Sequence, residues 1–470
     1  MKLPKRVYLI GIGGVGMGAL AGLFKKAGAE VYGSEAQKIY PPMSELLKEI
    51  GAQVFLGFNP ENLVKVSPEL VIIGNVARYD NPEVKYVLSE KIPYLSLPEA
   101  LFAFFIMHRK SLVVAGTHGK TTTSALLAHA LRVLGESPTF FLGGMLRDLA
   151  RNFELGQGKY VVLEGDEYDS AFFDKRPKFI HYAPLGAILT SLEFDHADIY
   201  EDFSALESAF GYFVSLIPSY GSLVYFADKN VAKVAQISSA KKLSYGPEGE
   251  LKLVSREVSQ RPIGQWVNYQ LDGKVGRFFL PLIGEHNALN ALGVLGLLKS
   301  LGFSEKTIEK AFASFPGTKR RQEVLLEDPC LVIDDFAHHP TAVSVTIAAV
   351  RETWPKKRLI ACFEPRTNTS RRKIFQEDYA KALSAADVVF LKNPPNPEKV
   401  PKEERLDLIK LVKDIIACGK EAYVAEDGEA LFVKLKKKIK PGDVVLFMSN
   451  GPFDNLTEKL VAFCRQNLKS

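Results

Sequence analysis

Short runs of β-branched and aliphatic residues alternate along this chain with stretches that have a helical period. Near the start, residues 7–10, 31–32 and 70–73 have the composition of buried strands, and residues 16–27 and 43–50 that of helices. The strands predicted further along are residues 112–115, 160–163, 188–190, 331–333, 359–363, 388–391 and 444–448. Such alternation indicates mostly parallel sheets covered by helices, so we expect an α/β fold.

The chain is too long for a single hydrophobic core. Its 470 residues suggest about three domains at the usual size of about 150 residues each. We expect three tandem domains, a Rossmann-like one at 1–107, a central P-loop domain at 108–316 and a second Rossmann-like domain at 317–470. The pattern is less regular between 220 and 280, which suggests an antiparallel excursion there.

Composition excludes a disordered protein, a fibrous protein and a small domain held together by disulfides. A hydrophobic share of 47% and a net charge of +6 describe a globular chain without a strongly basic surface, and the basic run at 434–440 is typical of a solvated face. The four cysteines form no C-x-x-C pair, which argues against a zinc or redox motif and for a reducing compartment. Glycines interrupt the apolar segment 7–24, so it is not interpreted as a signal peptide. We expect a cytoplasmic protein with no nucleic-acid or membrane partner, and nothing implies a protein partner.

A glycine-rich turn follows the first predicted strand. Its glycines are Gly11, Gly13, Gly14 and Gly16, and a helix is predicted to begin there. Glycine lets backbone N–H groups and the helix N-terminus approach a diphosphate. Glu35 lies about 20 residues further on, where a ribose-binding acid is found in dinucleotide-binding proteins. Taken alone, this turn favours a dinucleotide as its ligand over another diphosphate. The alternative is a structural turn that binds no ligand.

A second phosphate-binding candidate follows the strand predicted at 112–115. The segment consists of Gly116, Thr117, His118, Gly119, Lys120, Thr121 and Thr122. Its backbone amides can cradle phosphate, Lys120 can neutralise phosphate charge, and the Thr121 hydroxyl can bind Mg²⁺. The strand before it and the helix after it favour phosphate binding over a chance match.

Acidic residues follow two more predicted strands. Glu164 follows the strand at 160–163, and Asp195 and His196 follow the strand at 188–190. These groups can complete the coordination of a hard cation or accept a proton, although helix capping and solvent exposure are the alternatives for some of them.

Four further groups of polar residues lie after strands or in Gly-rich segments. They contain Asn287 and Asn290; Arg320; Asp335 and His338; and Arg366, Asn368 and Thr369. Amides suit an adenine edge, and arginines suit phosphates or carboxylates. Each group singly is also explained by a cap, a salt bridge or a turn. His338 and His339 are adjacent, but the following proline and the lack of a nearby cysteine argue against zinc.

Taken together, these motifs resemble those of the Mur ligase family. The segments GIGGVGM, AGTHGKTTT, EGDEYDSAFFDKR, LEFDHADIY, GEHNALNAL, DDFAHHPTA and FEPRTNT occur in the family's order and span the chain. The resemblance implies an ATP-dependent enzyme that forms ADP and phosphate while it joins UDP-N-acetylmuramate to an amine through an acyl phosphate. The motifs look most similar to those of ligases that attach the tripeptide L-Ala-γ-D-Glu-meso-diaminopimelate in peptidoglycan recycling.

The resemblance also implies roles for the candidate residues. The first glycine turn and Glu35 would bind the UDP-sugar instead of NAD. Catalytic roles are implied for Lys120, Glu164, Asp195 and His196, and Mg²⁺ ligation for Thr121, Glu164 and His196. ATP would be held by residues 116–122 with Asn287, Asn290, Arg320 and Asp335, the last on the ribose. The peptide would be held by His338, Arg366, Asn368 and Thr369.

Alternatives remain at this point. The near alternative is a ligase that adds L-alanine to UDP-N-acetylmuramate in peptidoglycan synthesis. Two others are an NAD(P)-binding oxidoreductase, suggested by the glycine turn, and a nucleotide switch that uses residues 116–122 for regulation. The third peptide residue, diaminopimelate or lysine, and the group that deprotonates the amine are both left open.

Overall fold

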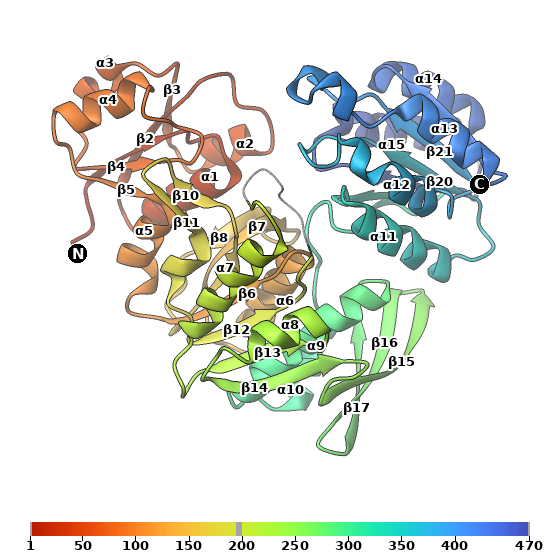
Figure 1. Ribbon diagram of the computed structural model, residues 1–470, viewed down its shortest axis with the longest axis horizontal. Helices are drawn as coiled ribbons and strands as arrows, with labels where there is room; N and C mark the ends of the chain where they lie inside the picture. The colour runs from red at the N-terminus through yellow and green to blue at the C-terminus, as the bar shows by residue number, and fades with distance from the viewer. Residues whose placement is uncertain (1, 194–199, 469–470) are drawn as a thin grey trace.

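The computed structural model describes residues 2–193 and 200–468, so Asp195 and His196 lie outside the described residues. Three sheets follow one another along the chain, each covered by helices (Figure 1). In that view the N-terminal domain (red and orange) and the C-terminal domain (blue) lie on either side above the central domain. The expected α/β fold with three mostly parallel sheets is confirmed.

The N-terminal sheet has five parallel strands in the order β3-β2-β1-β4-β5. The strands are β1 (Arg6–Ile10), β2 (Glu30–Glu35), β3 (Gln53–Leu56), β4 (Leu70–Ile73) and β5 (Tyr94–Ser96). The helices are α1 (Val15–Lys26), α2 (Met43–Glu49), α3 (Pro60–Val66), α4 (Pro82–Ser89) and α5 (Leu97–Leu101), the last continued by a π-helical turn at Phe102–Ile106. Strand β1 ends where the glycine turn begins, and Glu35 ends the neighbouring β2.

The central sheet has ten strands, in the order β17-β16-β15-β14-β13-β12-β6-β9-β7-β8. They are β6 (Lys110–Ala115), β7 (Thr139–Leu146), β8 (Arg151–Glu154), β9 (Tyr160–Gly165), β12 (Gly186–Leu189), β13 (Ser222–Phe226), β14 (Lys241–Gly246), β15 (Leu251–Gln260), β16 (Ile263–Leu271) and β17 (Lys274–Leu280). The α-helices are α6 (Lys120–Val133), α7 (Phe203–Ser215), α8 (Lys229–Ala235), α9 (Glu285–Ser300) and α10 (Glu305–Ala313). Strands β15, β16 and β17 pair antiparallel, as expected for part of the 220–280 region, whereas β13 and β14 remain parallel.

A two-stranded hairpin outside this sheet was not predicted. It consists of β10 (Asp169–Ala171) and β11 (Asp174–Pro177) and is followed by a 3₁₀ helix at Lys178–Tyr182. At its tip the Phe172 ring lies 6.3 Å from that of Tyr79, and the Phe173 ring lies 5.3 Å from that of Tyr94. The hairpin therefore packs aromatic rings from the central domain against the N-terminal domain.

The C-terminal sheet has the order β18-β19-β23-β20-β21-β22, and only β18 is antiparallel to its neighbour. The strands are β18 (Glu323–Leu326), β19 (Leu331–Asp335), β20 (Leu359–Phe363), β21 (Val388–Lys392), β22 (Glu421–Ala425) and β23 (Val444–Met448). The α-helices are α11 (Pro340–Thr353), α12 (Gln376–Leu383), α13 (Leu408–Ala417), α14 (Gly428–Lys438) and α15 (Leu456–Asn467). Strands β19, β20, β21 and β23 are buried along their whole length, and their sequences are apolar except for Asp334 and Asp335 at the end of β19 and Lys392 at the end of β21.

Close packing seats the N-terminal domain on the central one. A side chain at Gly22 of α1 would meet the Phe153 ring of β8 at 2.0 Å, so only glycine fits at this contact. At the start of the same helix, a side chain at Gly16 would lie 3.5 Å from Phe141. This contact brings the glycine turn beside the central domain. Among the described helices, none is both long and apolar enough to cross a lipid bilayer.

Candidate functional site

The segment 116–119 joins β6 to α6 in a left-handed turn. Gly116 has φ +133° and Gly119 has φ +83°, backbone values that residues other than glycine rarely adopt. A side chain at Gly116 would meet Thr190 Oγ1 at 2.3 Å, and one at Gly119 would meet Asn290 Oδ1 at 2.6 Å. The loop therefore needs glycine for backbone conformation and for close packing. Its amides lead into the N-terminus of α6, a geometry that binds phosphate.

Lys120, the first residue of α6, is folded back onto the loop. Its Nζ donates to Gly116 O at 2.6 Å and to Thr117 O at 3.2 Å, and it lies 2.9 Å from Glu167 Oε2. Burial disfavours the ammonium, but the attraction of Glu167, Glu164 and Asp166 outweighs it and raises the pKa of Lys120. The lysine is thus held protonated at the phosphate loop. Glu167 was not among the residues predicted for the site.

Thr121 and Glu164 lie together, as expected for a metal site. Thr121 Oγ1 donates to Glu164 Oε1 at 2.9 Å, and Gly143 N donates to Glu164 Oε2 at 2.8 Å. Burial raises the pKa of Glu164 even though Lys120 and Arg321 are nearby. A hydroxyl and a buried carboxylate whose charge is incompletely compensated are donors that suit a hard divalent cation. The predicted third ligand, His196, and the predicted base, Asp195, are not in the described part of the chain.

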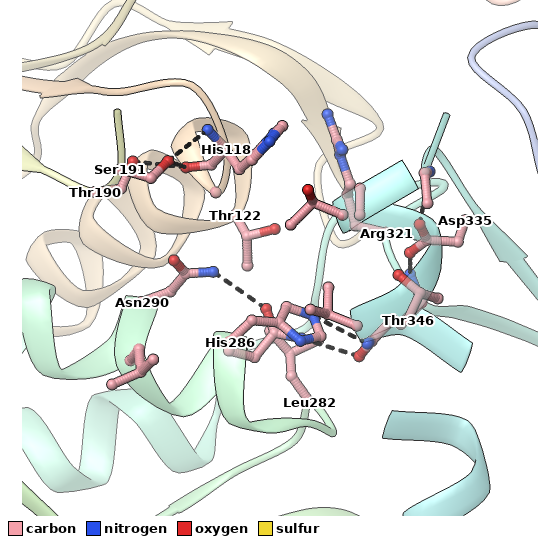
Figure 2. Close-up of a pocket in the computed structure, with 18 of the residues that line it drawn as sticks. His118, Thr122, Thr190, Ser191, Leu282, His286, Asn290, Arg321, Asp335 and Thr346 are labelled. Atoms are coloured by element: carbon pink, nitrogen blue, oxygen red, sulfur yellow. Dashed lines mark hydrogen bonds between the residues drawn. The ribbon is translucent and has the colours of Figure 1, made fainter. Parts of the chain in front are cut away.

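A cavity of about 310 Å³ lies beside the phosphate loop, between the central and C-terminal domains. Its wall includes His118 and Gly119 of the loop, Thr122 of α6, Asn287 and Asn290 of α9, and Asp335 at the end of β19. Figure 2 shows His286 and Asn290 facing Arg321, Asp335 and Thr346 across this space. The structure therefore brings together most of the residues that the sequence analysis associated with ATP.

Buried polar contacts fix the two asparagines and Asp335. Asn287 Nδ2 donates to Ile283 O at 2.9 Å, and Asn290 Nδ2 donates to Asn287 Oδ1 at 3.3 Å. Asp335 accepts from the backbone N–H groups of Gln322 and Ala337 at 2.8 and 2.7 Å. Burial raises the pKa of Asp335, against the attraction of Arg321. These side chains are held in fixed positions at the cavity wall, which suits recognition of a nucleoside.

The two adjacent arginines point to different places. Arg320 Nε lies 3.1 Å from Asp334 Oδ2, and its Nη2 donates to the carbonyls of Ser449 and Gly451. Arg321, in contrast, lines the cavity beside the phosphate loop, and its Nη2 donates to Thr121 Oγ1 at 3.2 Å. The sequence analysis associated Arg320 with ATP. In this structure Arg321, its neighbour in the same motif, lines the cavity beside the phosphate loop, whereas Arg320 contacts Asp334 and the carbonyls of Ser449 and Gly451.

Contacts from the phosphate loop also reach the C-terminal domain. His118 Nε2 lies 3.3 Å from Glu193 Oε2, which accepts from Thr341 Oγ1 at 3.1 Å. The hydrogen bond from His118 is the main cause that lowers the pKa of Glu193. Ligand atoms of His118, Glu193 and His339 all lie within 4.8 Å of one another. His339 is therefore part of this contact between domains, and both His339 and the adjacent His338 line a further cavity.

All three domains line a second cavity, of about 430 Å³, on the other side of the phosphate loop. Gly16 comes from the N-terminal domain, Lys120 and Glu164 from the central domain, and His338 from the C-terminal domain. We call this space the reaction-centre cavity. The predicted residues of the three domains thus meet around one space.

Lys178 is a further cation of the reaction-centre cavity. It follows the unpredicted hairpin, and its Nζ lies 2.5 Å from Asp166 Oδ2. Burial alone would raise the pKa of Asp166, but the attraction of Lys178 outweighs it and the pKa is lowered. Position in the chain gave no signal for Lys178, because it lies 11 residues after Glu167 and returns to the cavity only through the hairpin.

The N-terminal glycine turn is organised by Glu35. Gly13 N donates to Glu35 Oε2 at 3.0 Å, and Ala36 N donates to Oε1 at the same distance. Gly11 has φ +81°, and a side chain there would meet Val76 Cγ2 at 2.9 Å. Gly14 is the N-cap of α1, whose first turn carries no acidic residue. The turn thus combines free helix-terminal amides with a fixed carboxylate, as expected for a ribose and diphosphate site.

Apart from His338, which follows β19, the residues predicted to bind peptide lie after β20. Arg366 Nη1 lies 3.7 Å from Glu364 Oε1, and a side chain at Gly451 would meet Arg366 Cδ at 2.4 Å. Asn368 and Thr369 lie in the following turn, which is closed by hydrogen bonds between Thr367 and Ser370.

Behind this loop lies a buried pair that the sequence analysis missed. Lys392 Nζ lies 2.6 Å from Glu364 Oε1, and Ser449 Oγ donates to Oε2 of the same carboxylate at 2.6 Å. Side chains of Glu364 and Lys392 are 0% and 4% exposed. The pair anchors the ends of β20 and β21 and so fixes the start of the loop that carries Arg366.

Known proteins of one family are similar to this chain along most of its length. The chain matches models of the Mur ligase family catalytic domain at residues 6–109, the Mur ligase middle domain at 114–298 and the Mur ligase glutamate ligase domain at 320–451. It is 38% identical to the UDP-N-acetylmuramate–L-alanyl-γ-D-glutamyl-meso-2,6-diaminoheptanedioate ligase of Escherichia coli, over 97% of both chains.

Solved structures of such ligases are also similar to this chain. A murein peptide ligase of Psychrobacter arcticus superposes with a TM-score of 0.72 at 30% identity, over 99% of both chains. A UDP-N-acetylmuramate–alanine ligase of Thermotoga maritima superposes with a TM-score of 0.81 at 28% identity, over 98% of this chain and 99% of that chain. With all three segments matched by family models, the chain belongs to the Mur ligase family, whose members are ATP-dependent ligases.

Proposed function

We propose that this enzyme joins the carboxylate of UDP-N-acetylmuramate to the α-amine of the tripeptide L-Ala-γ-D-Glu-meso-diaminopimelate, with conversion of ATP to ADP and phosphate. The observation that carries the proposal is the reaction-centre cavity, into which the glycine turn, the phosphate loop and His338 project from three different domains. A ligase with two anionic substrates and an amine needs such a meeting point. Such a product belongs to peptidoglycan recycling, and a cytoplasmic location would fit its substrates.

Each domain then has its own substrate. Residues 1–107 would bind the UDP-sugar through Gly11, Gly13, Gly14, Gly16 and Glu35. Residues 108–316 would bind ATP through the loop 116–122 and the asparagines of α9, with Asp335 and Arg321 added from 317–470. The same C-terminal domain would bind the peptide through His338, Arg366, Asn368 and Thr369. The cavities described above support this division.

Activation of the carboxylate comes first. A carboxylate oxygen of the muramoyl group attacks the γ-phosphorus of ATP, and ADP leaves with the electrons of the broken P–O bond. Lys120, at the N-terminus of α6, holds the phosphate oxygens while their charge moves to ADP. Arg321 and Lys178 offset the charge of the two anions that must approach each other.

The amine then attacks the carbonyl carbon of the acyl phosphate, phosphate leaves, and the amine loses a proton. Asp195 or His196 would accept that proton. Thr121 and Glu164, with His196, would hold Mg²⁺, which supplies charge neutralisation at the transferring phosphoryl group. Glu164 is already oriented for this role by Thr121 Oγ1 and Gly143 N.

The near alternative is the addition of free L-alanine, favoured by the TM-score of 0.81 to the alanine ligase of T. maritima. The 38% identity to the E. coli tripeptide ligase favours the tripeptide. Neither a nicotinamide oxidoreductase nor a nucleotide switch accounts for the match of all three segments to Mur ligase models.

A panel of amine acceptors tests the proposal. The enzyme would be given ATP, Mg²⁺ and UDP-N-acetylmuramate with the tripeptide, the dipeptide L-Ala-γ-D-Glu or free L-alanine, and phosphate release would be measured. We expect the highest kcat/KM with the tripeptide and no release without UDP-N-acetylmuramate. Equal or faster turnover with L-alanine alone would assign the enzyme to the alternative reaction.

A further inference from the structure

The antiparallel strand β15 of the central domain contacts the last turn of α11 in the C-terminal domain. Arg256 of β15 donates from Nη1 and Nη2 to the two carboxylate oxygens of Glu352, at 3.1 and 3.0 Å. Beside this pair, Gln260 Nε2 donates to Thr353 O at 2.6 Å. The end of α11 is therefore fixed to β15 by both oxygens of one carboxylate and by a backbone carbonyl.

Arg256 also acts on the start of α9, through a buried glutamine of β16. Its Nη1 donates to Gln265 Oε1 at 3.0 Å, and Gln265 Nε2 donates to the carbonyls of Leu282 and Gly284 at 3.0 and 2.8 Å. Gln265 is 0% exposed. Because a guanidinium can only donate, it holds the amide oxygen on its own side and turns the amide N–H groups towards the two carbonyls.

The two ends of this network belong to two walls of the cavity beside the phosphate loop. Figure 2 shows Leu282 and His286 of the central domain and Thr346 of α11 around this space. A side chain at Gly284 would meet Ala349 Cβ of α11 at 2.6 Å, so the two walls already touch at that point. Within the described part of the chain, the cavity lining does not include the arginine of β15. That arginine thus contacts both walls from outside the cavity.

The chemistry of the network requires an arginine. Glu285 Oε2 lies 3.6 Å from Arg256 Nη2 and is a second carboxylate beside the guanidinium. A planar guanidinium can hold two carboxylate oxygens and an amide oxygen at once, which the single ammonium of a lysine does less well. The side chain of Glu352 is 41% exposed, so the pair contributes little to the stability of the whole fold. Its larger effect is on the position of one wall relative to the other.

We propose that Arg256 is a positioning residue for ATP, acting through Gln265 on the segment 282–287 and through Glu352 on α11 so that both walls fit one nucleoside. This inference rests on the proposed function, in which the cavity beside the phosphate loop binds ATP. Lys120 and Glu164, to which we assign roles in phosphoryl transfer, line the reaction-centre cavity instead. Arg256 therefore affects the binding of ATP and not the chemical step.

Steady-state kinetics of variants on both sides of the contact tests this role. Arg256→Gln removes the charge and the forked donor, Glu352→Gln removes the negative charge on α11, and a double variant combines the two. Arg256→Lys keeps the charge without the fork. Arg277→Gln is the matched control, because Arg277 of β17 pairs with Glu257 at 2.8 Å inside the central domain and both side chains are largely exposed.

We expect Arg256→Gln to raise the KM for ATP by about tenfold, since a hydrogen bond between charged groups is lost, with kcat close to that of the wild type. The KM for UDP-N-acetylmuramate should not change. Glu352→Gln should raise the KM for ATP in the same direction, and the double variant should be no worse than Arg256→Gln, because the two side chains act through one contact. Arg256→Lys should recover part of the loss, and Arg277→Gln should match the wild type.

Three outcomes would overturn the positioning role. Equal rises in the KM values for ATP and the sugar nucleotide, or a loss confined to kcat, would show a general structural defect. An unchanged KM for ATP in both single variants would show that the network does not act on the cavity. Additive effects in the double variant would show that Arg256 does not act through Glu352.

Failure of the proposed function gives a different result. A wild-type enzyme without ATP-dependent phosphate release would contradict the ligase function, and the role of Arg256 with it. Normal turnover of the wild type, together with unaffected Arg256→Gln and Glu352→Gln, would contradict the positioning role alone. Urea denaturation of each variant accompanies the kinetics, and we expect Arg256→Gln to unfold at nearly the same urea concentration as Arg277→Gln.

Discussion

Lys120 of the phosphate loop is paired with Glu167 at an Nζ–Oε2 distance of 2.9 Å, and their side chains are only 14% and 2% exposed. The lysine that we propose contacts the phosphates of ATP therefore has an anionic partner of its own within the protein. This pair gives Lys120 two separable roles, one in catalysis and one in stability.

Lys120→Met should lower kcat/KM by about 1000-fold or more, because transition-state charge on phosphate loses its cation. It should also lower the free energy of unfolding by about 3 kcal/mol, since breaking a buried pair leaves a carboxylate in a poorly solvated place. Adding Glu167→Gln should recover most of the stability and none of the activity. Phosphate release and urea denaturation measure the two effects.

The control for this pair is Lys159→Met, which removes a surface partner of Glu136 at 3.4 Å. An exposed ion pair contributes about 1 kcal/mol or less, so that variant should remain both stable and active. A double variant as unstable as Lys120→Met alone would show that Glu167 is not the group destabilised by loss of the lysine.

The two neighbours Arg320 and Arg321 show where sequence reasoning reached its limit. The motif indicated a cation for ATP, but Arg320 has φ +59° and Gln322 has φ +49°, so the backbone turns sharply between them and the adjacent side chains diverge. In such a segment no helical or strand periodicity predicts where each side chain points. The glycine turn, the phosphate loop and Glu164 could be predicted, because each lies directly at the end of a regular strand.

Lys178 shows a second limit. The alternation of strands and helices predicted the parallel sheets, but the short hairpin of β10 and β11 carries no such pattern, and it alone returns Lys178 to Asp166. The buried pair of Glu364 and Lys392 was missed for a related reason. Glu364 directly follows β20, and Lys392 is the last residue of β21. Only the order of strands in the sheet shows that β20 and β21 are neighbours.

Glu164→Gln should separate metal binding from folding of the site. Glutamine keeps the size of the side chain and can still accept from Thr121 Oγ1, now at 2.9 Å, but it loses the charge that a divalent cation needs. We expect kcat to fall by about 100-fold and the Mg²⁺ concentration for half-maximal activity to rise at least several-fold. Phosphate release measured across a Mg²⁺ titration tests both.

Chelation with EDTA should abolish turnover of the wild type, and added Mg²⁺ should restore it. Glu136→Gln, at the surface of the same domain, serves as the control and should titrate like the wild type. An unchanged Mg²⁺ dependence in Glu164→Gln would remove Glu164 from the metal site.

Replacing Glu35 should weaken the binding of one substrate only, UDP-N-acetylmuramate. Its carboxylate is held by Gly13 N at 3.0 Å, and a side chain at Gly13 would meet Glu35 Oε2 at 2.8 Å. Both Glu35→Ala and Gly13→Ala should therefore raise the KM for UDP-N-acetylmuramate by about tenfold, the usual effect of losing a hydrogen bond to a charged group. The KM for ATP should change much less, because ATP is assigned to another domain. Glu49→Ala, exposed on α2, is the control, and an unchanged sugar-nucleotide KM in both variants would contradict the assignment.

His286 should make stability depend on pH. Burial, assisted by the charge of Arg256, lowers its pKa to about 4, whereas an unfolded histidine titrates near pH 6.5. Between these values the unfolded chain binds a proton that the folded chain does not, so stability rises with pH and is lost as pH falls from about 6.5 to about 4. The loss reaches about 3 kcal/mol at the lower limit.

His286→Gln should flatten this part of the stability curve. Glutamine still offers an oxygen to Gln322 Nε2, which now lies 3.3 Å from His286 Nε2, but it does not titrate. Urea denaturation at intervals between pH 4 and 7.5 compares the variant with the wild type and with His108→Gln, which changes an exposed histidine. The His108 variant should follow the wild type, because the side chain that it replaces is exposed at the surface. Parallel curves of unfolding free energy against pH for the wild type and His286→Gln would contradict this prediction. They would show that His286 titrates in the folded enzyme as it does in the unfolded chain.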